Sequence, residues 1–378
     1  MPDYLPFARP TIDEAMVGAL AETLRSHWIA TGPQVASFEK QLSNYVGGRP
    51  VIALTSATAA LEVALQLINT GPGDEIITPA QNFFAAANMI ERSGARAVFV
   101  DVELKSRNMN LDATNAAITS RTKALLPTDF NAPLDIDAMM SLAKPHNLRI
   151  IQDAALAMGS RYGNSTVGSR GDLVAFSFHP NKNMTTIEGG ALVVNNETEA
   201  ERALPLRFHG IKRRPDGTRD IEVASGKFNM SDVSARLGIA QLAHLDSWCL
   251  KRKELATHYF ACLSNDDLLS EEMLPPRHNP GHSWNMFTVL LPLNAMKISR
   301  AEFIAAMQTE KIGVGISYEA VHLTSLFRSK GYKERMFPVS ERIANETVTL
   351  PLFPSMTRSN VERVCEALRK IIRLENKK

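Results

Sequence analysis

The fold of this 378-residue chain is constrained most by an alternation of short apolar segments with longer segments of helical periodicity, which fills its first two thirds. Seven of the apolar segments predict strands, at Val51–Leu54, Glu75–Thr78, Ala97–Val100, Ala124–Pro127, Arg149–Gln152, Leu173–Phe178 and Ala191–Val194. Apolar residues recur with helical spacing between several of them, as at Thr58–Ile68 and Ile136–Ala143. Strands that alternate with helices form a mostly parallel sheet with both faces covered. The sequence therefore predicts an α/β fold.

The last third of the chain departs from this alternation. Its expected elements are a long helical stretch from about Val233 toward Leu263, a strand at Phe287–Leu291, and helices at Ala301–Thr309 and about Asn360–Leu374. This change predicts a large domain at residues 1–244 and a smaller α+β domain at residues 245–378. The polar segment Asp216–Ser225, which lies between Pro215 and Gly226, is expected to be an exposed loop.

Charge and cysteine content exclude several classes of protein. The 42 Lys and Arg residues balance 40 Asp and Glu residues, so a net charge of +2 offers no electrostatic footprint for nucleic acid. No apolar run reaches the roughly 18 residues that span a membrane. The start, Met1-Pro-Asp-Tyr-Leu5, lacks the basic and apolar regions of a signal peptide. Cys249, Cys262 and Cys365 are an odd number without a CxxC pair, which suits a reducing cytosol better than a disulfide framework or a zinc site. We therefore expect a cytoplasmic enzyme.

Two ionisable residues follow predicted strands at the edge of the sheet where ligands bind. Asp153 ends the segment Leu148-Arg-Ile-Ile-Gln-Asp153, and Lys182 comes soon after the strand Leu173–Phe178. Pyridoxal 5′-phosphate (PLP) needs this combination, because a lysine amine forms its Schiff base and a carboxylate keeps its ring nitrogen protonated. For either residue alone, a surface lysine or a helix-capping aspartate is the commoner explanation.

Two further features fit the same cofactor. Ser56–Ala59 leads from a strand into a helix, whose free N–H groups and dipole would hold a phosphate. Phe83 follows the strand Glu75–Thr78, where an aromatic ring could stack on a flat cofactor. An ordinary helix N-cap and a core phenylalanine are the alternatives. The four features occur in the order that a PLP site requires, and together they carry more weight than any one.

Motifs of competing chemistries are missing from the sequence. Ser225-Gly-Lys-Phe228 lacks the hydroxyl residue and the upstream glycine of a phosphate-binding GxxxxGK[ST] loop. Gly313-Val-Gly-Ile-Ser-Tyr318 lacks the third glycine of a dinucleotide-binding GxGxxG motif. The nine histidines are scattered without the spacing of metal ligands, so no metal site is expected.

Several motifs together resemble the DegT/StrS aminotransferases. They are Trp28-Ile-Ala-Thr-Gly-Pro33, Thr55-Ser-Ala-Thr-Ala-Ala-Leu61, Gly73-Asp-Glu-Ile-Ile-Thr-Pro79, Asp153-Ala-Ala155, Phe176-Ser-Phe-His-Pro-Asn-Lys-Asn183, Glu188-Gly-Gly190 and Leu350-Pro-Leu-Phe-Pro354. The resemblance implies a fold-type I, PLP-dependent enzyme that transaminates keto sugars attached to nucleotides, as in the biosynthesis of lipopolysaccharide or O-antigen amino sugars. The chain is most similar to the branch that produces UDP-4-amino-4-deoxy-L-arabinose, which shares the motifs Trp-Ile-x-Thr-Gly-Pro and Ser-Ala-Thr-Ala and a Lys-aromatic-Asn stretch like Lys227-Phe-Asn229.

The resemblance also implies a role for individual residues. Lys182 would form the Schiff base and move a proton as general base and acid, with L-glutamate as the amino donor. Asp153 would pair with the ring nitrogen, with Ala155 next to it at the cofactor, and Phe83 would lie against the ring. The phosphate would be held by Thr58, Ala59 and Ser177. In a homodimer with shared active sites, Lys227 and Asn229 would reach the partner's cofactor. Candidate substrate contacts are Trp28, Thr31, His179, Tyr318 and His322.

Four positions depart from the family pattern around the ring edge and the sugar pocket. Leu156 stands where a Gln or His is usual, and Asp129, Ser165 and Ser317 replace a His, an Arg and a second His. These departures predict an altered substrate or reactivity and leave two alternatives open, a PLP-dependent sugar dehydratase and a non-catalytic regulatory homologue. Relatives that dehydrate replace the lysine with histidine, so Lys182 argues against the first alternative. The intact Lys182 and Asp153 weigh against the second.

Overall fold

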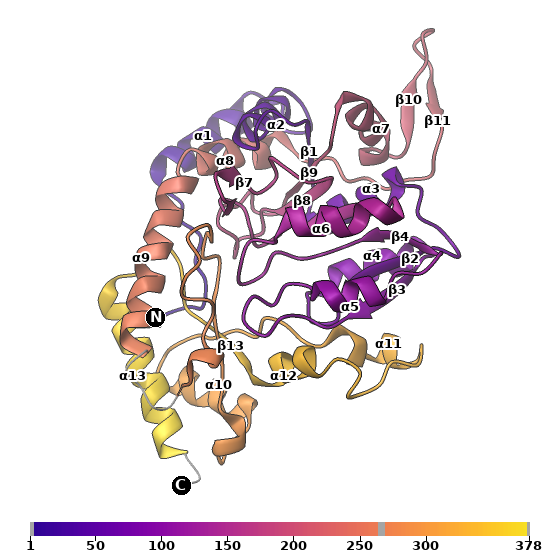
Figure 1. Ribbon diagram of the computed structural model, residues 1–378. Coiled ribbons are helices and arrows are strands. Elements are labelled where there is room, and N and C mark those ends of the chain that lie inside the picture. The colour runs from indigo at the N-terminus through magenta and orange to yellow at the C-terminus, as the bar shows by residue number, and fades with distance from the viewer. Residues whose placement is uncertain (1–3, 264–268, 376–378) are drawn as a thin grey trace.

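The first two thirds of the chain are built on one twisted sheet (Figure 1). The structure, a computed structural model, describes residues 4–263 and 269–375, so Met1–Asp3, which entered the signal-peptide argument, lie outside it. The strands of the sheet are β1 (Val51–Leu54), β2 (Glu75–Pro79), β3 (Arg96–Val100), β4 (Thr122–Leu125), β5 (Arg149–Asp153), β8 (Leu173–Ser177) and β9 (Gly190–Val193). They lie in the order β1-β9-β8-β5-β4-β2-β3, and β9 alone runs antiparallel to its neighbours. The predicted α/β fold with a mostly parallel, seven-stranded sheet is confirmed.

Helices cover both faces of this sheet. One face carries α3 (Ala57–Leu67), α4 (Ala85–Arg92) and α7 (Glu197–Arg207). The other carries α2 (Pro33–Tyr45), α5 (Leu111–Ala116), α6 (Ile136–Ala143) and α8 (Asp232–Leu242). Neighbouring residues such as Ile76 and Ile77 on β2 point into these two different cores, and both are fully buried. Burial on both faces explains why the strands read as continuous apolar runs without alternation.

The C-terminal part of the chain has a core of its own. It contains α9 (Leu245–Leu263), α10 (Arg300–Thr309), α11 (Ser325–Arg328), α12 (Pro338–Glu346), α13 (Arg358–Leu374) and the antiparallel pair β12 (Phe287–Leu290) and β13 (Thr347–Leu350). Its apolar cluster is formed by residues between 255 and 372, together with Leu5 from the N-terminus. A domain boundary near residue 245 remains our assignment.

The helical stretch predicted from Val233 to Leu263 is two helices rather than one. It breaks at Ala243 and His244, between α8 and α9. The break has a structural reason, because α8 packs against α2 and against α1 (Glu14–Arg25), whereas α9 packs against α13. The chain changes direction where it changes its packing partner.

The segment Asp216–Ser225, predicted as an exposed loop, is partly a β-hairpin. Strands β10 (Ile211–Arg213) and β11 (Arg219–Ile221) pair antiparallel across a turn in which Gly217 has a φ of +83°. The hairpin extends away from the sheet in Figure 1, and the Ile221 side chain is 67% exposed. A second short hairpin joins β6 (Arg161–Tyr162) to β7 (Ser165–Thr166).

The described residues contain neither a helix that could cross a membrane nor a cluster of metal ligands. Among the described helices, none has both the length and the apolarity to cross a membrane. Within residues 4–263 and 269–375, no group of three or more His, Cys, Asp and Glu side chains is placed to hold a metal ion.

Candidate active site

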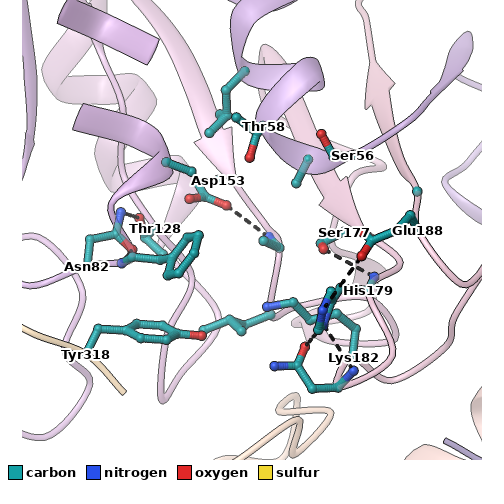
Figure 2. A pocket seen from close by; sticks show the side chains of 18 residues that line it. Ser56, Thr58, Asn82, Thr128, Asp153, Ser177, His179, Lys182, Glu188 and Tyr318 are labelled. Carbon is teal, nitrogen blue, oxygen red and sulfur yellow. Dashed lines mark hydrogen bonds and ion pairs between the residues drawn. The ribbon is translucent and has the colours of Figure 1, made fainter. Parts of the chain in front are cut away.

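A cavity of about 390 Å³ opens at the carboxyl ends of β5 and β8, next to the start of α3 (Figure 2). A volume of this size is typical of small-molecule sites. The cavity brings together eight of the residues predicted from the sequence, which are Thr58, Phe83, Asp153, Ala155, Ser177, His179, Lys182 and Tyr318. It lies at the edge of the sheet where parallel strands place their ligands.

Asp153 is the last residue of β5, and its side chain is buried. One carboxylate oxygen accepts a hydrogen bond from the Ala155 N–H at 3.1 Å. Burial raises the pKa of Asp153, while the Ala155 N–H, the charge of Lys182 and a hydrogen bond from Asn82 oppose that rise. A buried carboxylate without a full counter-charge is suited to hold a cation such as a protonated ring nitrogen.

Lys182 lies in the turn that follows β8, where its N–H donates to the His179 carbonyl at 2.9 Å. Burial lowers the pKa of the Lys182 amine to about 8, although the negative charge of Asp153 acts in the opposite direction. A much larger fraction of this amine is neutral near physiological pH than in an ordinary lysine. A neutral amine is the nucleophilic form that attacks a carbonyl group.

The start of α3 provides the anion-binding end of the cavity. Ser56 caps the helix, and its hydroxyl accepts from the Ala59 N–H at 3.0 Å. The N–H groups of Ala57 and Thr58 therefore remain for a phosphate, since the first turn of a helix has no internal partners for them. The hydroxyls of Thr58 and Ser177 also line the cavity. The N–H of Ala59 donates to the Ser56 hydroxyl and its side chain lies in the core, so its expected phosphate contact stays a prediction.

The backbone at this end approaches very closely. A Cβ added to Gly190 on β9 would lie 2.3 Å from the Ser56 carbonyl carbon and 2.4 Å from the Ala57 nitrogen. Only glycine leaves room for β9 to support the start of the helix. The amine, the acid and this cradle together match the functional groups of PLP.

Aromatic side chains form one wall of the cavity. The ring of Phe83, which is 52% exposed, lies 5.5 Å from the ring of Tyr318, and Tyr318 packs edge-on against Phe130. Tyr318 comes from the segment between α10 and α11, so the C-terminal part of the chain contributes to a site built on the sheet. Burial raises the pKa of the Tyr318 hydroxyl, which therefore stays protonated.

Several lining residues were not among the predicted ones. The Asn82 side chain, at the end of β2, donates to the Thr128 hydroxyl at 2.7 Å, and both face the cavity (Figure 2). Both follow strands of the sheet, so the strand-end rule that found Asp153 would also have found them. At the mouth, His179 Nδ1 lies 2.8 Å from the Asn181 amide oxygen, with Glu188 on the opposite side of the ring.

Five predicted residues lie elsewhere in the structure. His322 is fully buried, its Nε2 lies 3.2 Å from Glu341, and its ring packs edge-on against Phe337. Its expected contact with substrate is corrected, because this histidine belongs to a packed interior. The other four residues do not line this chain's own cavity. They are Trp28, Thr31, Lys227 and Asn229.

Thr31 and Asn229 are joined to each other instead. The Asn229 amide donates to the Thr31 hydroxyl at 2.6 Å, and that hydroxyl donates to the Met230 carbonyl at 2.6 Å. The fully buried Asp232 carboxylate accepts from the N–H groups of Gly32, Gln34 and Val35 at the start of α2. Asp232 was not predicted, and it fixes the loop that carries the Trp-Ile-Ala-Thr-Gly-Pro motif.

The four departures from the family pattern have different surroundings. Leu156 lies in an apolar cluster with Phe130, Met286 and Tyr318 beside the cavity. Asp129 is buried behind it, where its carboxylate accepts from the Leu134 N–H and the Gln152 amide. The remaining two are the buried Ser317, bonded to Thr349, and Ser165 in the β6–β7 hairpin.

Known proteins resemble the chain over nearly its whole length. The sequence profile of the DegT/DnrJ/EryC1/StrS aminotransferase family matches residues 10–369. The uncharacterized protein MJ1066 of Methanocaldococcus jannaschii is 34% identical, over 98% of each chain. Spr1654 of Streptococcus pneumoniae, described as a sugar aminotransferase, superimposes with a TM-score of 0.91 at 28% identity over 98% of each chain. DesV of S. venezuelae does so with a TM-score of 0.87 at 30% identity, over 97% of this chain and 99% of its own.

Spr1654 has been solved in its apo, PLP and PMP forms. The cavity described above carries an amine, an acid and a phosphate cradle that fit the same cofactor. We conclude that the chain belongs to the DegT/DnrJ/EryC1/StrS aminotransferase family of sugar transaminases, whose cofactor is pyridoxal 5′-phosphate.

Proposed function

We propose that this enzyme transfers an amino group from L-glutamate to the keto group of a nucleotide-linked sugar. The observation that carries the proposal is the convergence of Lys182, Asp153 and the start of α3 on one cavity. Bound PLP supplies an electron sink that stabilises negative charge on the substrate carbon. The chain's own residues then have to bind, orient and move protons.

Each of these tasks falls to a different residue. Lys182 Nζ, with its lowered pKa, would take the proton from the α-carbon of the amino donor and hold it for return when the amino group is transferred. Asp153 holds the ring-nitrogen proton, and Thr58, Ser177 and the N–H groups that begin α3 hold the phosphate. Phe83 covers one face of the ring.

We further propose a homodimer in which each active site is completed by the partner. Large apolar side chains are exposed near the Thr31–Asn229 contact and on the β10–β11 hairpin, including Trp28 at 59% and Ile221 at 67%. The buried Asn229 amide oxygen has no hydrogen-bond partner. A second copy would cover the apolar side chains and bring Lys227 and Asn229 to the neighbouring cofactor.

The sugar nucleotide would enter at the mouth of the cavity. We assign His179 and Tyr318, which line it, and Trp28 and Thr31 of the proposed partner as its contacts. Within the family we propose the branch that aminates UDP-linked 4-keto-L-arabinose, on the motifs around Trp28 and Lys227. The reaction would belong to lipopolysaccharide or O-antigen amino-sugar biosynthesis in the cytoplasm, where the three cysteines, which form no disulfide among the described residues, stay reduced.

The half-reaction with L-glutamate tests the proposal. The PLP-loaded enzyme is mixed with L-glutamate, and both the cofactor absorbance and the 2-oxoglutarate released are measured. Conversion to the amine form, followed by amination of a keto sugar from a panel of UDP- and dTDP-linked sugars, is the expected result. Turnover of a keto sugar without glutamate conversion would indicate a dehydratase. Neither reaction despite full cofactor loading would indicate a regulatory homologue.

A further inference from the structure

Asn82 joins three parts of the candidate site through a single side chain. It lies just beyond β2, is 2% exposed, and lines the cavity. Its amide oxygen accepts from the Phe83 N–H at 2.8 Å, and its amide nitrogen donates to the Thr128 hydroxyl at 2.7 Å. Figure 2 shows both groups close to the Asp153 carboxylate. Asn82 thus contacts the residue that covers the cofactor ring and reaches toward the acid that binds it.

The order of the strands explains how these residues meet. The strands β5, β4 and β2 are neighbours in the sheet, and Asp153, Thr128 and Asn82 lie at or just past their carboxyl ends. A backbone bridge pairs Thr128 with Asp153, and the Asp129 N–H donates to the Asp153 carbonyl at 3.1 Å. The three side chains therefore form a row along one edge of the sheet.

These two hydrogen bonds also fix which way the Asn82 amide faces. Its oxygen must point at the Phe83 N–H, because the amide nitrogen in that place would set two donors against each other. The nitrogen has two hydrogens, and Thr128 accepts only one. The other remains available to the Asp153 carboxylate, and the Asn82 amide opposes the rise in the pKa of Asp153.

A local role alone explains less of this arrangement. Asparagine often caps a turn by accepting a neighbouring N–H, which would account for the bond from Phe83. It would not account for the amide nitrogen of this buried residue, which donates to Thr128, a residue that lies just past the end of a different strand. Burying a polar group without partners is costly, and here both ends of the amide are used.

We propose that Asn82 is a positioning residue. It keeps the Asp153 carboxylate ionised and holds it in place relative to Phe83, so that both face the cofactor ring. The inference rests on the proposed assignment of Asp153 to the ring nitrogen, but not on the identity of either substrate. Asn82 acts through Asp153, so its loss should change how cofactor binding depends on pH and not merely how stable the fold is.

Cofactor affinity measured against pH tests this inference. The dissociation constant of PLP is followed by fluorescence quenching from acidic to mildly alkaline pH, for the wild-type chain and for Asn82→Ala. Binding should weaken on the acid side as Asp153 is protonated. We expect that acid limb to move to higher pH by about one unit in Asn82→Ala, because a hydrogen bond to a charged group is lost.

Two further variants separate an effect on the Asp153 carboxylate from an effect on the stability of the fold. In an Asp153→Asn background, Asn82→Ala should cause no additional movement of the acid limb, since the group on which it acts is gone. Thr78→Val is the matched control. It removes a buried hydrogen bond to the Leu126 carbonyl from the same strand, so it should lower stability and leave the acid limb in place.

The result that would overturn the inference is an acid limb in Asn82→Ala that coincides with the wild type, or one that moves equally in the Asp153→Asn background. Should Asn82→Ala fail to fold, Asn82→Asp retains the acceptor for the Phe83 N–H. The added negative charge should move the limb upward by more than one unit, and an unmoved limb would again overturn the inference. If Asp153→Asn alone leaves PLP affinity unchanged, the proposed function fails instead.

Discussion

At the scale of single residues, the site depends on what burial does to two ionisable groups. The amine of Lys182 and the carboxylate of Asp153 are both removed from water, which moves the pKa of each toward neutrality. Each also opposes the shift of the other by its charge. The lowered pKa of Lys182 suits an amine that gains and loses a proton at the pH of a cell, whereas the proposed role of Asp153 requires that it stay ionised.

The first prediction follows from the lowered pKa of Lys182. The rate at which the apoprotein captures PLP should rise with pH and level off above about 8, because only the neutral amine attacks the cofactor. Stopped-flow absorbance measures this rate. In Asp153→Asn this rise in rate should occur at lower pH, since the charge that raises the pKa of Lys182 is gone. A rise that stays in place or moves to higher pH would contradict this coupling.

The second prediction concerns Ile187, a β-branched residue with a φ of +73° in the loop after Lys182. Its side chain is 53% exposed, so it contributes little burial in exchange for a left-handed backbone. Ile187→Gly should raise the free energy of unfolding of the apoprotein by about 1 kcal/mol, measured by urea denaturation. A lower stability would show that the contacts of the isoleucine outweigh the backbone strain.

Only part of the site can be predicted from the sequence at this scale. Lys182, Asp153 and Thr58 follow from their positions next to predicted strands, because backbone topology brings strand ends together. His322 shows the limit, since its neighbours Phe99 and Phe337 are distant in sequence and decide that it is buried. The direction of a side chain depends on tertiary packing, which residue spacing does not encode.

At the scale of secondary structure, the start of α3 depends on its contact with β9. Ser56 caps the helix, β1 leads into it, and Gly190 of β9 lies directly against its first peptide groups. The phosphate cradle is therefore a property of two strands and a helix together. We therefore expect a change in β9 to weaken the binding of the cofactor phosphate.

The third prediction tests that contact. Gly190→Ala places a methyl group within 2.4 Å of Ser56 and Ala57 backbone atoms, which must move apart. Affinity for PLP should fall at least about tenfold, roughly 1.4 kcal/mol, and affinity for pyridoxal, which lacks the phosphate, should fall less. Gly18→Ala is the control, because Gly18 lies in α1 with no atom within 4 Å of its added Cβ. Equal losses for both ligands would place the damage outside the cradle.

Whole elements were predicted better than their junctions. All seven strands of the large sheet were predicted, because strands that are buried on both faces are continuous apolar runs. The break between α8 and α9 was missed because apolar spacing continues through Ala243 and His244. The β10–β11 hairpin was missed because its strands are short and polar, without a buried face to produce alternation.

At the scale of the whole molecule, the site draws on distant parts of the chain. Tyr318 closes the cavity from the C-terminal part, and its carbonyl accepts from the Gln81 amide, at the end of β2, at 3.3 Å. Trp28, Lys227 and Asn229 lie outside the cavity although their motifs belong to the family pattern. The proposed homodimer accounts for their position, because each would then lie against the site of the partner.

The fourth prediction is that two inactive variants restore each other. Lys182→Ala lacks the amine, whereas the double variant Lys227→Ala, Asn229→Ala lacks the proposed contribution to the partner's site. Mixed dimers should contain one intact site, so an equilibrated mixture should regain about a quarter of the wild-type transaminase activity. Activity no higher than that of the separate variants, although mixed dimers form by native mass spectrometry, would exclude a shared site.

The attachment point of the cofactor tests the central claim most directly. The PLP-loaded enzyme is reduced with borohydride, digested, and analysed by peptide mass spectrometry. We expect a single phosphopyridoxyl group on Lys182 Nζ, and none in Lys182→Ala treated in the same way. A modification on another lysine, or an equal yield from Lys182→Ala, would contradict it.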